Sequence, residues 1–111
     1  MTPFVSAWFT AFVFTQLVEV PIYSRALGCS LLVAFGASAI THPIVWFGFF
    51  TPHWHASYMV KLVSAELFAW LAEAAYFRFL FKKKNALVWA LVANASSLGL
   101  GLLSRHLFGS P

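Results

Sequence analysis

All three acidic residues of this chain lie within long apolar stretches, where a carboxyl group is costly. Glu19, Glu66 and Glu73 are joined there by one histidine, His42. A charged side chain at the centre of a bilayer costs about 2.5–3.5 kcal/mol on insertion scales, so such residues usually face a protein interior and carry function. In that setting carboxyl and imidazole groups can bind and release a proton or bind a small cation. These four residues are therefore the first candidates for a functional site.

The positions of these residues along their apolar runs predict two polar layers. A helix rises about 1.5 Å per residue, and by that count His42 and Glu66 reach one depth while Glu19 and Glu73 reach another. We expect the side chains of His42 and Glu66 to lie within about 4 Å of each other, or to share one water. Two facing carboxyl groups in a low-dielectric interior should share one proton.

Further polar side chains fall on the same helical faces as these candidates. Residues three, four or seven positions apart share a helix face, and this spacing relates Glu66 to Glu73 and Ser38 to His42. The predicted proton- or cation-handling residues are Glu19, Glu66, Glu73, His42 and Asn94, and the predicted supporting polar residues are Gln16, Ser38, Thr41, Tyr76 and Ser97.

Four apolar runs must position these residues. The 111 residues are 61% hydrophobic and only 9% charged, whereas soluble domains carry about 25% charged residues. A spanning helix needs about 20 apolar residues, and the short polar breaks between the runs imply antiparallel neighbours. We predict an all-α membrane protein, one domain over residues 1–111, whose four transmembrane helices form an up-down bundle. The helices are expected at about 4–23, 27–50, 57–80 and 86–108.

The two halves of the chain show a weak internal repeat. A glutamate precedes the run LLVAFGASAIT in the first half, and another precedes LVWALVANASS in the second. Such matches also arise by chance in apolar sequence, so a duplicated helical hairpin and a chance similarity both stay open. In the alignment the equivalent pairs are Glu19 with Glu73, Tyr23 with Tyr76, Ser38 with Asn94, and Thr41 with Ser97.

The uneven distribution of basic residues predicts the orientation of the chain. The break between the third and fourth runs contains Lys82, Lys83 and Lys84, and loops rich in lysine stay in the cytoplasm. We therefore expect Lys82–Lys84 in the cytoplasm and both termini outside, in a bacterial inner membrane. The lipid bilayer is the expected surrounding, and no nucleic-acid partner is needed because the lysines suit anionic lipid.

Metal binding and catalysis find less support in the sequence. An intramembrane metal site would use His42 and Glu66 with a third ligand, and the HWH segment offers His53 and His55 as another weak pair. Zinc sites normally combine three or four protein ligands, so neither pair suffices, and no cofactor can be assigned. The chain has no HExxH segment, no Gly-rich phosphate loop and no convincing serine, histidine and acid set, so an enzyme is not favoured.

Two classes of function remain from the residues alone. The first is a small permease- or channel-like protein, expected to be a homo-oligomer, whose axial Glu, His and Asn side chains handle a proton or a small cation. The second is a non-catalytic membrane subunit whose polar stripe binds a partner helix in a larger membrane complex. The first is favoured, because three intramembrane carboxyl groups without basic partners are costly for packing alone.

Overall fold

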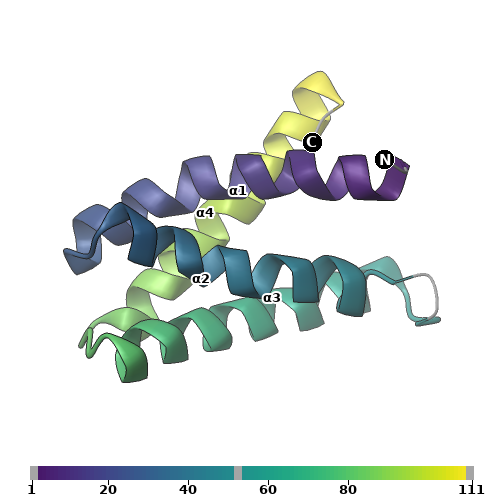
Figure 1. Ribbon diagram of the computed structural model, residues 1–111. Coiled ribbons are helices and arrows are strands. Elements are labelled where there is room, and N and C mark those ends of the chain that lie inside the picture. The colour runs from purple at the N-terminus through teal and green to yellow at the C-terminus, as the bar shows by residue number, and fades with distance from the viewer. Residues whose placement is uncertain (1–2, 52–53, 110–111) are drawn as a thin grey trace.

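The structure, a computed structural model, describes residues 3–51 and 54–109, and its regular elements are all helical (Figure 1). Two short π-helical segments extend the second and third α-helices, so the elements combine into four long rods. The elements are α1 (Pro3–Leu27), α2 (Leu31–Ile44), η1 (Val45–Phe49), α3 (Tyr58–Ala75), η2 (Tyr76–Leu80) and α4 (Ala86–Phe108).

The four rods form an up-down bundle, as the sequence predicts. α1 packs against α2 and α4, while α3 packs closely against α4 and more loosely against α2. Figure 1 shows the α1–α2 and α3–α4 connections at one end of the bundle, which we call the hairpin end. Both termini and the α2–α3 connection lie at the opposite end, which we call the terminal end.

The predicted end of the first helix is about one turn too early. α1 continues through Pro21 to Leu27, because a proline kinks a helix without always ending it. Gly28 then takes a φ of 63°, a left-handed conformation that glycine adopts without steric cost. Ser30 starts α2 as its N-cap, with its hydroxyl oxygen 3.1 Å from a backbone N–H of the first turn.

Pro43 marks a change of backbone geometry in the second rod. A proline has no N–H to donate to the preceding turn, and the chain becomes π-helical from Val45 onward. The structure thus has a π segment directly after the turn that contains this proline. Short π segments inside helices are frequent at functional sites.

Small residues make the closest contacts between the rods. Alanine and glycine allow two helix backbones to approach each other in a membrane. A Cβ added to Gly36 would overlap the hydroxyl of Tyr76, which donates a hydrogen bond to the Val33 carbonyl at 2.8 Å. The alanines that are at most 1% exposed are Ala34, Ala37, Ala65, Ala86, Ala90 and Ala93.

Three of the rods are long and apolar enough to cross a bilayer, namely 3–27, 31–49 and 86–108. The α3 rod does not meet this description and carries Lys61, Glu66 and Glu73. Large apolar side chains are exposed along the outside of all four rods, as a surface in contact with lipid requires. The chain is therefore an integral membrane protein.

Candidate functional site

Two buried carboxyl groups lie at the centre of the bundle. Glu19 on α1 and Glu73 on α3 are only 1% and 2% exposed, and both side chains line the same cavity between the helices. The structure brings these two residues together, as their depths along the helices predict. We call them the carboxyl pair.

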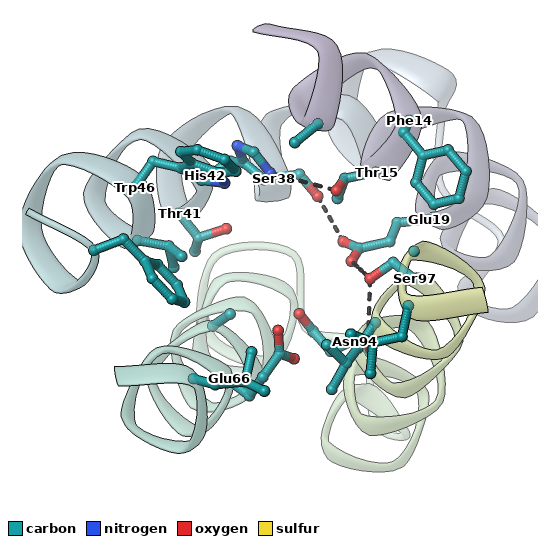
Figure 2. Close-up of a pocket in the computed structure, with 18 of the residues that line it drawn as sticks. Phe14, Thr15, Glu19, Ser38, Thr41, His42, Trp46, Glu66, Asn94 and Ser97 are labelled. Atoms are coloured by element: carbon teal, nitrogen blue, oxygen red, sulfur yellow. Dashed lines mark hydrogen bonds between the residues drawn. The ribbon is translucent and has the colours of Figure 1, made fainter. Parts of the chain in front are cut away.

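Two serine hydroxyls bind the carboxyl group of Glu19. Ser38 on α2 donates to Oε1 at 2.6 Å, and Ser97 on α4 donates to Oε2 at 2.6 Å. Figure 2 shows Glu19 reaching into the space between α2 and α4 to meet them. Each oxygen of this carboxyl group therefore accepts a short hydrogen bond from a different helix.

The carboxyl group of Glu73 accepts hydrogen bonds from three helices. The Tyr23 hydroxyl on α1 donates to Oε1 at 2.5 Å, and Asn94 Nδ2 on α4 donates to the same oxygen at 3.2 Å. The Thr41 hydroxyl on α2 donates to Oε2 at 2.7 Å. The two carboxyl groups thus connect all four rods through one buried network.

The hydrogen bonds of the two glutamates repeat each other across the bundle. The second helix of each hairpin carries two of these polar residues, Ser38 and Thr41 on α2 and Asn94 and Ser97 on α4. Each carboxyl group bonds the first of the two in its own hairpin and the second of the two in the other hairpin. The four bonds are Glu19 with Ser38 and with Ser97, and Glu73 with Asn94 and with Thr41.

The same register corrects one pair in the sequence alignment. Tyr23 lies four positions after Glu19, and Phe77 lies four positions after Glu73. Tyr23 and Phe77 are both 0% exposed and their ring centroids are 4.4 Å apart. By position after the glutamate, Tyr23 corresponds to Phe77, whereas the sequence alignment pairs Tyr23 with Tyr76.

Two hydroxyl groups of the network have a second acceptor within reach. The Thr41 hydroxyl lies 3.2 Å from the Ala37 carbonyl, besides its bond to Glu73. The Ser97 hydroxyl lies 3.1 Å from the Asn94 carbonyl, besides its bond to Glu19. A hydroxyl has one proton to donate and can also accept, so each of these two side chains can turn between a carboxyl group and a backbone carbonyl.

The aromatic pair Tyr23 and Phe77 fills the bundle on the hairpin side of the carboxyl pair. Ala34, Ala86 and Ala90 pack around it, each 0% exposed. We call the two rings the aromatic plug. Because these side chains pack without exposure, the plug separates the carboxyl pair from the hairpin end.

A cavity of about 390 Å³ lies on the other side of the carboxyl pair. Glu19 and Glu73 line its floor, and its lining continues to Phe4, Tyr58 and Arg105 at the terminal ends of their helices. Neither ring of the plug lines it. The carboxyl pair is therefore reached from the terminal end, through a space that Figure 2 shows between the four helices.

His42 and Glu66 both line the cavity, but they do not bond each other. His42 Nε2 lies 3.4 Å from the Thr15 hydroxyl on α1, and His42 Nδ1 is buried without a hydrogen-bond partner in the described part of the chain. Glu66 points into the space between the helices (Figure 2) and accepts no hydrogen bond from the described residues. Lys61, the nearest lysine in sequence, donates instead to the Thr51 carbonyl at 3.1 Å. The direct contact expected between His42 and Glu66 is therefore wrong, and the alternative of one shared water stays a prediction.

Two predicted supporting residues lie away from the network. Gln16 is buried and donates from Nε2 to the Phe35 carbonyl at 3.2 Å, with its Oε1 left without a partner among the described residues. Tyr76 is only partly buried and bonds the backbone of α2. Neither residue contacts the carboxyl pair through a hydrogen bond.

The metal-binding readings gain no support from the geometry. Within residues 3–51 and 54–109 no three His, Cys, Asp or Glu side chains are placed to hold a metal ion. His55 is exposed within the α2–α3 connection. His53 lies outside the described residues.

Sequence reasoning missed two residues of the site, Tyr23 and Thr15. Tyr23 follows Glu19 by four positions and so shares its helix face, which is a signal that the sequence contains. The fit of Thr15 to His42 depends on how α1 and α2 are rotated against each other, and no sequence pattern gives that rotation.

Comparison of the chain with protein-family models, with curated proteins and with solved structures gives no match. The kind of protein that this chain is must therefore be inferred from its own residues. They describe a small integral membrane protein built around a buried, hydrogen-bonded pair of carboxyl groups.

Proposed function

We propose that this protein handles a proton or a small cation at its carboxyl pair, as a small permease or channel does. One observation carries the proposal: Glu19 and Glu73 lie buried among hydroxyl donors at the floor of one cavity, which leads to the terminal end. Two interacting carboxyl groups in a low-dielectric site titrate as a unit and can hold one proton between them.

The hydroxyl groups of Thr41 and Ser97 suit such a change of charge. Beside an ionised carboxylate, each hydroxyl donates to it. Beside a protonated carboxyl group, the hydroxyl can donate to its backbone carbonyl and accept the proton of the acid instead. Neither hydroxyl is left unpaired in either state, and an unpaired buried group would cost about 1–3 kcal/mol.

Glu66 and His42 are the next polar groups on the path to the terminal end. Glu66 lies seven residues before Glu73 on the same face of α3, and His42 lines the cavity from α2. Asn94 completes the proposed set of handling residues by bonding Glu73. We propose that a proton or cation passes these groups between the terminal end and the carboxyl pair.

We also propose that the two hairpins derive from one duplicated hairpin. The repeated hydrogen bonds of Glu19 and Glu73 support this origin, as do the matched rings of the plug. Because the hairpins run in the same direction (Figure 1), the axis that relates them lies along the bundle.

The orientation proposed for the chain in a bacterial inner membrane places the terminal end outside and Lys82–Lys84 in the cytoplasm. The lysines are exposed or half-buried at the hairpin end. The positive-inside rule assigns a lysine-rich loop to the cytoplasm, so we place the hairpin end there. With Cys29→Ala as background, we expect Lys83→Cys to resist a membrane-impermeant maleimide in intact cells and to react after lysis. Equal labelling in intact cells would reverse the proposed orientation.

The carboxyl chemistry is tested with Glu19→Gln/Glu73→Gln in reconstituted vesicles that contain a pH-sensitive dye. We expect the wild-type protein to pass protons down a pH gradient and the double variant to lose that flux, because an amide cannot bind and release the proton. Gln16→Met, which alters a buried polar residue outside the network, is the matched control and should keep the flux. An unchanged flux in the folded double variant would contradict the proposal.

One observation favours a second candidate, a non-catalytic subunit of a larger membrane complex. Every oxygen of the two carboxyl groups already accepts a hydrogen bond, as a purely structural network requires. Purification under mild conditions separates the two candidates, since a homo-oligomer supports the permease and co-purifying membrane subunits support the second candidate.

A further inference from the structure

The outer part of the cavity contains a carboxyl group that the network does not use. Glu66 lies in the cavity wall, half-buried, with no hydrogen-bond donor among the described residues. We infer that this part of the cavity binds an organic cation, a protonated amine or quaternary ammonium with an apolar body, and that Glu66 is its charge partner. The inference deepens the proposed function, on which it rests for the role of the cavity, by naming the class of cation.

The charges around the cavity favour a cation. Three carboxyl groups line it, those of Glu19, Glu66 and Glu73, whereas Arg105 is the one lysine or arginine among the described lining residues. Arg105 belongs to the last turn of α4, at the mouth. A cavity with low-dielectric walls concentrates the field of its charges, so the interior attracts positive ligands.

Aromatic rings form a continuous wall in the cavity that Glu66 also lines. Trp46 lies 6.2 Å from the His42 ring and 6.2 Å from Phe50, and Phe50 lies 6.0 Å from Tyr58, measured between ring centroids. Tyr58 stands eight positions before Glu66 in α3, and both line the cavity. Ring faces attract cations and bury the apolar groups that surround an organic ammonium, which gives the cation a surface as well as a counter-charge.

The same features fit an organic cation better than a metal ion. A metal ion needs several oxygen, nitrogen or sulfur ligands around one point, and no such group of His, Cys, Asp or Glu exists in the described part of the chain. The oxygens of the carboxyl pair already accept hydrogen bonds. The cavity volume of about 390 Å³ lies at the small end of the range for small-molecule pockets.

The test uses benzyltrimethylammonium, whose charge does not depend on pH, and calorimetry on the purified protein in an uncharged detergent. We expect the wild-type protein to bind this probe and to bind benzyl alcohol, which has no charge, far more weakly. Glu66→Gln should weaken probe binding by at least about tenfold, since it removes the charge of a partly buried pair. Trp46→Leu should also weaken it, because the variant loses the ring face but keeps the carboxylate.

Leu67→Ala is the matched control, because Leu67 is the neighbour of Glu66 and is exposed on the outer face of α3. It should bind the probe as the wild type does. Equal affinity for the probe in the wild type and in folded Glu66→Gln would overturn the inference, and so would the absence of probe binding to the wild type. The carboxyl pair is tested by other variants and by proton flux without probe, so failure of one proposal is distinguishable from failure of the other.

Discussion

Replacing Glu73 with leucine is expected to lower the free energy of unfolding by about 1–3 kcal/mol. This is the cost of leaving a buried hydroxyl, here that of Tyr23, without a hydrogen-bond acceptor. Leucine fills a similar volume but accepts no hydrogen bond. Thr41 and Asn94 keep alternative acceptors in the carbonyls of Ala37 and Ala90. The Tyr23 hydroxyl, in contrast, donates to Glu73 alone among the described residues.

Glutamine at the same position should be tolerated. Its amide oxygen can accept from Tyr23, and its amide nitrogen can donate to the Thr41 hydroxyl once that hydroxyl turns to the Ala37 carbonyl. The measurement is unfolding of the protein in mixed micelles by increasing sodium dodecyl sulfate, followed by circular dichroism. The order of stability should be wild type and Glu73→Gln above Glu73→Leu.

A double variant makes this prediction specific to the network. Tyr23→Phe removes the stranded hydroxyl, so Glu73→Leu/Tyr23→Phe should recover most of the stability that Glu73→Leu alone loses. If the two losses simply add, the hydroxyl of Tyr23 does not depend on Glu73 and the network is assigned wrongly.

Replacing Phe77 with alanine should open a leak across the bundle. The plug is the part of the core that separates the carboxyl pair from the hairpin end, and its rings are 0% exposed. Removing a buried phenylalanine ring costs about 3–5 kcal/mol and leaves a cavity, which here would join the existing cavity to the hairpin end. We expect vesicles with Phe77→Ala to dissipate a pH gradient faster than vesicles with the wild-type protein, and to do so even when Glu19 and Glu73 are both glutamine.

Phe77→Leu is the control, because leucine retains more of the ring volume and should leak less than alanine. Circular dichroism and a single elution peak establish that each variant is folded before flux is measured. A folded Phe77→Ala protein that holds the gradient as the wild type does would show that the plug is not the barrier.

The depth of each polar residue could be read from the sequence, but its direction around the helix could not. Depth follows from counting residues, and this count correctly placed Glu19 and Glu73 at the same depth in the bundle. The same count placed His42 beside Glu66, yet His42 turns toward Thr15 on α1. α2 and α3 pack more loosely than the other neighbours, and their mutual rotation is set by packing with α1 and α4, which no local pattern encodes.

The boundaries of the helices show a similar division. The fourth helix has the predicted bounds, 86–108, because a lysine-rich break precedes it and Gly109 ends it with a φ of 73°. The first helix runs further than predicted because Pro21 lies on the exposed face, where a lost backbone hydrogen bond disturbs no packing. Tyr76, predicted for the site, bonds the backbone of α2, whereas Tyr23, four positions after Glu19, bonds Glu73.

The axis that relates the two hairpins runs along the bundle, so it keeps the two ends of the bundle distinct. Transporters built from inverted halves can exchange an outward-open and an inward-open shape by swapping the conformations of those halves. Here the halves run parallel, so their exchange carries the terminal end onto itself and the hairpin end onto itself. The entrance and the sealed end of this molecule are therefore not interchangeable by symmetry, and any opening toward the lysine-rich side has to come from displacement of Tyr23 and Phe77.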